Sequence, residues 1–298
     1  MRHVGNRLEL GGEARDLVTS SSGIDVVDEA TVRADVDAGG RLASLDISPS
    51  SHPVEPLLGR LVGSGFRDAV HEAFPDDVAA GTALALLLDD LPVATLISGY
   101  ARLYLGEIPA DSMGPNMKAD ICSGWRSSGT MMLSVRSGNG VPVTVGPTAP
   151  TIAAERSDDP FGWHDIGPLA VGAMRRRRLV DVHRDGAGAL DVTAMFRDTH
   201  VLPDGTETVL HEYVVTGSVD PVAGVFTSCS AVPRVLPYVE CPVAAASADR
   251  LVGLRVDAAR TFVRSELRGT STCTHLNDLL RSLGDIDSLS ATLERVAG

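Results

Sequence analysis

An internal repeat is the feature that most constrains how this 298-residue chain folds. Three pairs of segments correspond in the same order along the two halves: Val32–Asp37 with Val215–Asp220, Leu61–Gly63 with Leu251–Gly253, and Val78–Leu91 with Thr270–Leu283. In the last pair, a threonine and four leucines keep their spacing without a gap. This self-similarity predicts two related units that arose by duplication. Unrelated units with similar patterning are the alternative.

Each unit is predicted to place β-strands before helices. Runs rich in Val, Thr and Phe, separated by turn signals, predict strands at 178–184, 189–202, 206–219 and 224–232, and at 31–37 and 41–47 in the first half. Amphipathic runs predict helices at 244–253, 257–268, 274–283 and 288–296, and at 65–74, 82–91 and 93–105. Strands followed by helices favour an antiparallel sheet with helices packed on one face, an α+β fold.

The domain boundaries follow from this pattern. Residues 1–105 are predicted to form a degenerate N-terminal unit, and residues 174–298 a C-terminal unit. We expect the Gly/Pro-rich connection between them, residues 106–173, to be ordered, because a structureless segment of this length is improbable in a compact protein. It is predicted to contain a strand pair, Met131–Arg136 and Val141–Val145.

The net charge and the distribution of apolar residues indicate which partners and which cellular compartment to expect. The net charge of -13 disfavours nucleic acid and anionic membrane as partners. The most apolar stretch, Thr82–Leu105, is interrupted by charged residues and a proline, so we expect a buried core helix and no membrane span. The N-terminus lacks the apolar core of a secretory signal. Four widely spaced cysteines fit a reducing cytoplasm.

An ordered series of short segments in the second half carries a family resemblance. The series is Met174-Arg-Arg-Arg-Arg178, Arg184-Asp-Gly186, Asp191-Val192, Arg197-Asp-Thr199, Leu210-His211, Leu251-Val-Gly-Leu254 and Cys273-Thr-His-Leu276-Asn-Asp-Leu-Leu280. It resembles the bacterial family called domain of unknown function 2889, over about Met174 to Leu283. The resemblance implies a bacterial, cytoplasmic protein and a link to catabolism of acyl-CoA or aromatic compounds. It implies no particular activity, fold or cofactor.

A predicted hairpin supplies the first candidate site. Asp204-Gly205 between two β-like runs is typical of a two-residue turn. That turn would place Asp198 opposite His211, with His200 on the same face as Asp198. Two imidazoles and a carboxylate would suit a divalent metal such as Fe, Zn or Mn. Alternatively, Asp198 would orient His211 for acid/base catalysis, or the three residues would form a solvent-facing polar patch.

The start of the helix predicted at 274–283 supplies a second candidate. Cys273 and His275 would lie at its positive end, where a thiol pKa is lowered, and would form a nucleophile–base pair. The repeat adds an internal control, because the positions equivalent to Cys273, His275 and Asp278 are Gly81, Ala83 and Leu86. A buried, hydrogen-bonded histidine is the alternative for His275.

Two further features carry weaker predictions. Trp163-His164 lies in a Pro/Gly-rich loop that would either reach the second unit or form a plain surface turn. The run Arg175–Arg178 would place two arginines on each face of a strand, either to bind an anion or as a solvated charge run. The sequence has no Gly-x-Gly-x-x-Gly, phosphate-binding loop, Gly-x-Ser-x-Gly or His-Glu-x-x-His motif. The readily recognised nucleotide-binding, hydrolase and zinc-protease classes are therefore excluded.

Two functional hypotheses result. The first is a hydrolase or lyase acting on a small organic acid, ester or CoA thioester, with His211 and Asp198 in acid/base or metal-ligand roles and His200, His275 and Cys273 nearby. The second is a non-catalytic small-molecule-binding or accessory protein. The oligomeric state stays open.

Overall fold

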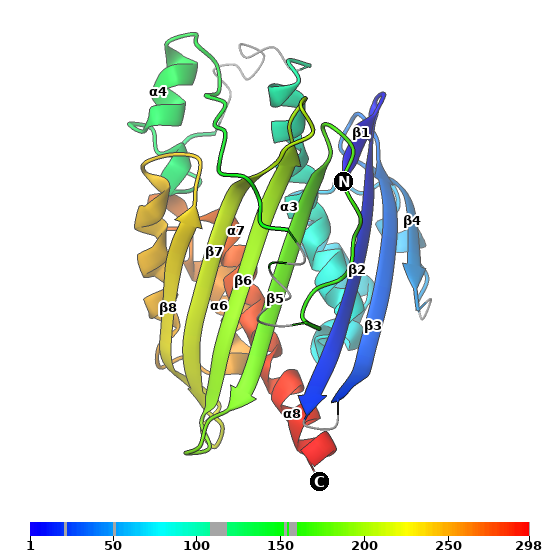
Figure 1. The fold of residues 1–298 in the computed structure, drawn as a ribbon, viewed down its shortest axis with the longest axis vertical. Helices are drawn as coiled ribbons and strands as arrows, with labels where there is room; N and C mark the ends of the chain where they lie inside the picture. Colours follow the sequence, from blue (N-terminus) through cyan, green and yellow to red (C-terminus); the bar gives the residue numbers. More distant parts are fainter. Residues whose placement is uncertain (21–22, 50–51, 108–117, 152–153, 155–159, 298) are drawn as a thin grey trace. The chain divides into compact units, whose positions relative to one another are not determined.

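The computed structural model describes residues 1–298 except 21–22, 50–51, 108–117, 152–153, 155–159 and 298. It contains two four-stranded antiparallel sheets with helices, which confirms the predicted α+β class (Figure 1). The chain divides into two compact units. The first comprises Met1–Ala101, Pro150–Met174 and Ala291–Gly298, and the second comprises Arg102–Ala149 and Arg175–Ser290.

The first unit begins with its sheet, in the order β1-β2-β3-β4. The strands are β1 (Arg2–Val4), β2 (Arg7–Ser20), β3 (Gly23–Val36) and β4 (Leu42–Ser48), followed by η1 (Glu55–Leu57), α1 (Phe66–Ala73), α2 (Pro75–Ala80) and α3 (Ala83–Tyr104). The end of α3, from Arg102 to Tyr104, belongs to the second unit. The strands predicted at 31–37 and 41–47 are confirmed as parts of β3 and β4. Strands β1 and β2 were not predicted. Much of β2 is polar, and only Leu8, Leu10 and Val18 are buried in it, so its apolar pattern is weak.

Helix α3 is a single helix where two were predicted, at 82–91 and 93–105. Pro92 lies inside it, and the apolar residues on both sides are buried. Packing therefore holds the helix together across a residue that lacks a backbone N–H. By length and composition α3 could cross a membrane, but 56% of its most apolar window is buried inside the protein, as in a core helix.

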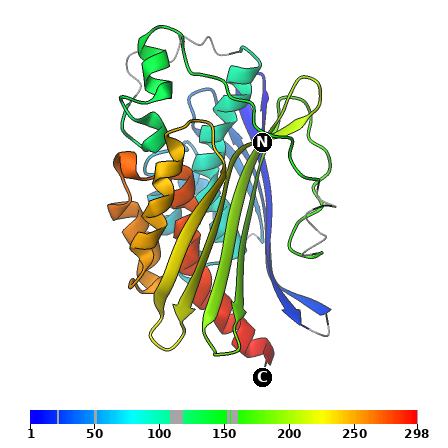
Figure 2. The ribbon, with the colours of Figure 1, turned by 60° about the vertical axis from the view of Figure 1, so that its left-hand side comes forward.

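The second unit has the sheet order β5-β6-β7-β8. Its elements are η3 (Ser123–Trp125), α4 (Thr130–Arg136), β5 (Met174–Arg184), β6 (Leu190–Val201), β7 (Glu207–Asp220), β8 (Val225–Val235), η4 (Cys241–Leu251), η5 (Val256–Ala258), α6 (Ala259–Glu266), η6 (Gly269–Ser271), α7 (Thr274–Ser282), η7 (Leu283–Asp285) and the first half of α8 (Ile286–Ala297), which passes into the first unit at Ala291. Helices α6 and α7 lie on one side of the sheet (Figure 2). Their apolar side chains share one core with the inward-facing residues of β6, β7 and β8.

The strand pair predicted at Met131–Arg136 and Val141–Val145 is wrong. Residues Thr130–Arg136 form helix α4, and 141–145 have no regular structure. Met131 and Met132 are buried against Tyr238 in a small apolar cluster, so packing favours the helix. Gly138 then ends the helix with a positive φ of 77°.

The two sheets share their irregularities as well as their order. In the β2–β3 pair, Asp16 lies opposite Asp28 and Leu17 opposite Val26, which leaves Val27 as an extra residue. In the β6–β7 pair, Asp198 lies opposite His211 and Thr199 opposite Val209, which leaves Leu210 as the extra residue. The alignment of Val32–Asp37 with Val215–Asp220 makes Val27 and Leu210 equivalent. A bulge at the same place supports two units of common origin.

The connection after each sheet repeats too, but in a different register from the one predicted. The N–H of Val62 bonds to the carbonyl of Gly40, and the N–H of Val256 bonds to that of Gly224. Val62 is therefore equivalent to Val256, so the predicted equivalence of Leu61 with Leu251 is off by four residues. The leucine stripes of α3 and α7 keep the predicted equivalence: Leu84, Leu88 and Leu91 are buried, like Leu276, Leu280 and Leu283.

Candidate acid/base site

The hairpin between β6 and β7 places Asp198 opposite His211, as predicted, but by a different route. The predicted two-residue turn is wrong. Leu202 donates its N–H to the carbonyl of Thr206 at 2.9 Å, so the loop is the three residues Pro203–Gly205, and Gly205 has a φ of 85°. This loop shifts the register by one residue, and the bulge at Leu210 shifts it back.

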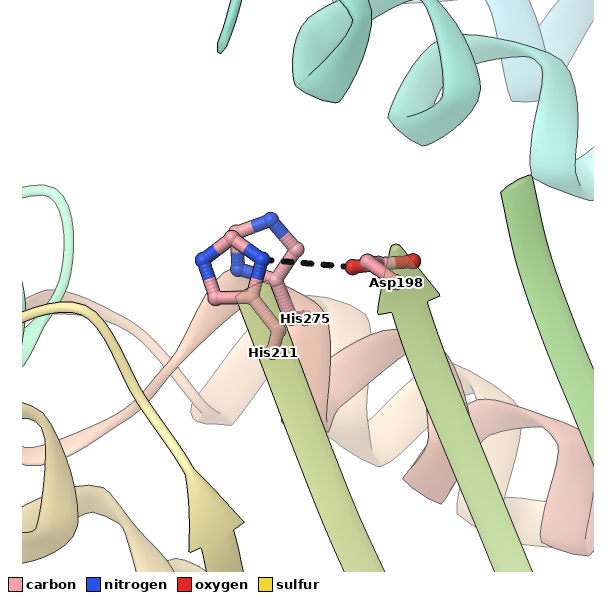
Figure 3. A group of neighbouring side chains, drawn as sticks. All are labelled: Asp198, His211 and His275. Carbon is pink, nitrogen blue, oxygen red and sulfur yellow. Dashed lines mark ion pairs between the residues drawn. The ribbon is translucent and has the colours of Figure 1, made fainter. Parts of the chain in front are cut away.

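Asp198, His211 and His275 form one cluster at the ends of three elements (Figure 3). Asp198 comes from β6, His211 from β7 and His275 from the first turn of α7. The Oδ2 atom of Asp198 lies 3.3 Å from Nδ1 of His211. The rings of His211 and His275 are stacked, with centroids 4.0 Å apart and planes 22° apart. Asp198 is fully buried and His211 is 2% exposed, so water does not screen this pair.

Arg176 of β5 fixes the carboxylate of Asp198. Its Nε and Nη2 donate to the two carboxylate oxygens at 2.7 and 2.8 Å, a bidentate pair. Burial alone would raise the pKa of Asp198, but the charge and hydrogen bonds of Arg176, with help from His211, hold that pKa well below its usual range. Asp198 is therefore an anion at neutral pH.

The ionic network continues onto α7. Nη1 of Arg176 lies 3.3 Å from Asp278, and Arg281 donates to the same carboxylate at 2.6 Å. Arg178, the next arginine on this face of β5, donates to the backbone carbonyl of Asp278 at 3.3 Å. Arg175 points to the other face, where it lies 3.7 Å from Glu207. The alternation predicted for the Arg175–Arg178 run is thus present, and two of its arginines, Arg175 and Arg176, contact protein carboxylates.

His275 is an uncharged imidazole in this setting. Burial, reinforced by the nearby His211, lowers the pKa of His275 to about 3. Its Nδ1 lies 3.8 Å from the sulfur of Cys273. Burial raises the pKa of Cys273 to about 12, so this residue is a thiol at neutral pH. The lowered thiol pKa expected from the helix start is therefore wrong, and the pair lacks the thiolate that a cysteine nucleophile needs.

His200 lies apart from the cluster that the structure brings together. Its ring contacts Tyr104, with centroids 4.8 Å apart, while His275 occupies the place beside His211. The predicted metal trio of Asp198, His200 and His211 is replaced by Asp198, His211 and His275. Sequence reasoning missed this because α7 meets the sheet through long-range packing, which strand register does not encode.

The residue types of the cluster suit a metal ion, but the arrangement of the rings does not. The three ligand atoms lie within 4.8 Å of one another. A metal ion must lie in the plane of each imidazole that binds it. Planes 22° apart on rings 4.0 Å apart meet only on the order of 10 Å away, whereas a Zn–N bond is about 2.1 Å. Arg176 also occupies both oxygens of Asp198. The arrangement fits proton transfer better than metal binding.

The Trp163-His164 loop lies in the first unit, against strand β2. His164 is 3.6 Å from Glu13, and Arg15 donates to the carbonyl of Phe161 at 2.7 Å. Trp163 is buried, with 8% exposed. These contacts anchor the loop to β2.

Comparison with known proteins identifies a family for the second unit only. Residues 174–288 match the family described as "Protein of unknown function (DUF2889)", which confirms the resemblance found in the sequence. All three residues of the cluster lie inside the match, and so do Arg176 and Asp278. No curated protein and no solved structure matches the chain.

Proposed function

We propose that the second unit is a hydrolase or lyase for a small organic acid, ester or CoA thioester, with His211 as its general acid/base. One observation carries the proposal: the buried carboxylate of Asp198, held in place by Arg176, lies 3.3 Å from Nδ1 of His211. An anionic carboxylate beside one imidazole nitrogen favours the proton on that nitrogen, which leaves Nε2 as the nitrogen that exchanges protons.

In hydrolysis, Nε2 of His211 takes a proton from water while the water oxygen attacks the carbonyl carbon. Asp198 stabilises the imidazolium that forms, and the proton then passes to the departing alkoxide or thiolate. In elimination, the same nitrogen takes the proton next to the carboxyl or thioester group, and the leaving group departs with its electron pair. Either reaction requires a general base within reach of the proton that it removes.

Arg176 and His275 are positioning residues in this scheme. Arg176 holds Asp198 in place and keeps it ionised. His275, which stays uncharged, stacks on one face of the His211 ring and adds no second positive charge when His211 is protonated.

The ionic network favours a second candidate, a non-catalytic binding or accessory protein. Arg176, Asp278 and Arg281 tie β5 to α7 with almost no exposed surface. A buried network of this kind fixes packing without any reaction.

The discriminating experiment is turnover of model substrates by the full chain. We expect hydrolysis of p-nitrophenyl acetate or an S-acetyl thioester, or elimination from a short 3-hydroxyacyl thioester, with kcat/KM reduced at least 100-fold in His211→Gln. His183→Gln is the matched control, because His183 lies on β5 with its side chain 61% exposed. Equal rates in His211→Gln and wild type, or no turnover of all three probes, would favour the non-catalytic candidate.

Metal analysis of the same protein tests the argument from the rings. We expect less than one tenth of an equivalent of Fe, Zn or Mn per chain, and kcat/KM unchanged by a chelator. A stoichiometric metal that disappears in the His211→Ala, His275→Ala double variant would show that the rings rearrange around an ion, and the site would then be a metal centre.

A further inference from the structure

A second pair of polar side chains lies next to the acid/base cluster in the same unit. His200 follows Asp198 by two residues on β6, so the alternation of the strand places both on one face, about 7 Å apart along the strand. The ring of His200 contacts the ring of Tyr104, at 4.8 Å between centroids and 39° between planes. Tyr104 is the last residue of α3.

Both members of this pair carry buried polar atoms that nothing in the described part of the chain satisfies. His200 is 2% exposed, and neither of its ring nitrogens has a hydrogen-bond partner among the described residues. The hydroxyl of Tyr104 is buried and likewise has no partner there. Buried polar groups are almost always hydrogen-bonded, because leaving them unpaired costs stability. Three such atoms meeting at one ring contact point to a bound polar group.

The chemistry of the pair defines that group. Burial lowers the pKa of His200 and raises the pKa of Tyr104, so both are uncharged. A neutral imidazole offers one donor and one acceptor, and a phenol hydroxyl offers both. The complement is an uncharged group that donates and accepts, such as a carboxamide or a hydroxyl. A carboxylate, which only accepts, would leave the acceptor nitrogen of His200 unpaired.

We propose that His200 and Tyr104 form a substrate-binding subsite for an uncharged carboxamide or hydroxyl group, placed about 7 Å along β6 from Asp198, the partner of His211. This inference deepens the proposed function and rests on it for the role of His211. It adds a requirement on the substrate: a short acyl chain with a hydrogen-bonding group at its far end.

A matched pair of esters tests the subsite. Methyl 4-carbamoylbutanoate carries a carboxamide at the end of its chain, and methyl 5-methylhexanoate carries an isopropyl group of nearly the same shape. We expect the carboxamide ester to bind wild type at least about tenfold more tightly than its isostere. The preference should fall below about twofold in His200→Phe and in Tyr104→Phe, and His183→Gln should keep it.

A second measurement does not depend on the variants folding. In wild type labelled with ¹⁵N-histidine, the carboxamide ester should shift the ring nitrogens of His200, and the isostere should leave them unchanged. The subsite is overturned if neither ester binds, if both bind equally, if the preference survives in both variants, or if the His200 nitrogens do not respond.

The same esters separate failure of the subsite from failure of the catalytic proposal. Preferential binding with a His200 shift but no methanol release would retain the subsite and reject hydrolysis. Methanol release at equal rates from both esters would retain hydrolysis and reject the subsite.

Discussion

Replacing Asp198 by asparagine should destabilise the second unit strongly. The change keeps the side-chain volume but removes the charge that Arg176 contacts through two hydrogen bonds. Removing one partner of a buried ion pair costs about 3–5 kcal/mol, because the other charge stays buried. Arg176 retains a second carboxylate, Asp278, at 3.3 Å. We therefore expect a loss at the lower end, about 3 kcal/mol.

Urea unfolding can follow this unit separately. The two tryptophans divide between the units, Trp125 in the second and Trp163 in the first. In a Trp163→Phe background, fluorescence reports on the second unit through Trp125. With an m value of about 1–3 kcal/mol per molar urea, the midpoint should fall by about 1–3 M. Asp257→Asn is the control, because its ion pair with Arg255 is largely exposed and its loss should not move the midpoint.

The pH dependence follows from the lowered pKa of Asp198. A carboxyl whose folded-state pKa lies below its unfolded value stabilises the fold fully above the unfolded value, about 3.9, and loses that stabilisation as the pH falls towards the folded value. The difference between wild type and Asp198→Asn should therefore be constant at neutral pH and shrink below about pH 4. Two results would refute the buried ion pair. One is a shift of the urea midpoint in Asp198→Asn no larger than that in Asp257→Asn. The other is a stability difference between wild type and Asp198→Asn that does not change with pH.

Three further predictions test other parts of the structure. Gly146→Ala should lower the melting temperature by several degrees, because a Cβ there would lie 1.7 Å from a carbonyl oxygen of β7, whereas Gly186→Ala, with open space, should not. His275 should stay unprotonated down to about pH 4 in an NMR titration, since its pKa is about 3; an ordinary histidine titration would contradict its burial. Gly59→Ala and Gly253→Ala, at positive φ in equivalent turns, should each cost about 1–2 kcal/mol in urea unfolding, and unequal costs would argue against equivalence.

Local signals account for most of what the sequence predicts correctly. The strands of the β6–β7 hairpin and the stripe Leu276–Leu283 depend on alternation and helical spacing, which are local. The side of the sheet on which Asp198 lies depends only on the two-residue period of a strand. The predicted pairing of Asp198 with His211 is therefore correct although the turn was predicted wrongly, because the bulge at Leu210 cancels the one-residue shift of the loop. Strand β2 was missed because its solvent-facing side is polar, and α4 because two glycines resemble a hairpin turn.

Long-range packing accounts for most of what the sequence does not predict. The contact of His275 with His211 requires the start of α7 to lie over the first part of β7, and nothing near either residue specifies that. The same holds for Arg176 and Asp278, which are distant in sequence. One sequence feature could have predicted the contacts of Arg176. Arginines on the covered face of a sheet need carboxylate partners, because an unpaired charge is costly to bury. Asp198 and Asp278 are candidate partners in the same half of the chain.

The first unit shows which part of the site the fold itself requires. By the shared bulge, Asp28 of β3 is equivalent to His211 of β7. Asp28 accepts the N–H of Ala83 at 2.8 Å and so caps the start of α3. In the second unit the residue equivalent to Ala83 is His275, and Cys273, the described residue at the N-cap of α7, makes no side-chain cap hydrogen bond.

The repeated fold does not require the two imidazoles, since the first unit has Asp28 at the position of His211 and Ala83 at the position of His275. An imidazole pair that the fold does not require, beside an ionised carboxylate, is better explained by proton chemistry than by stability.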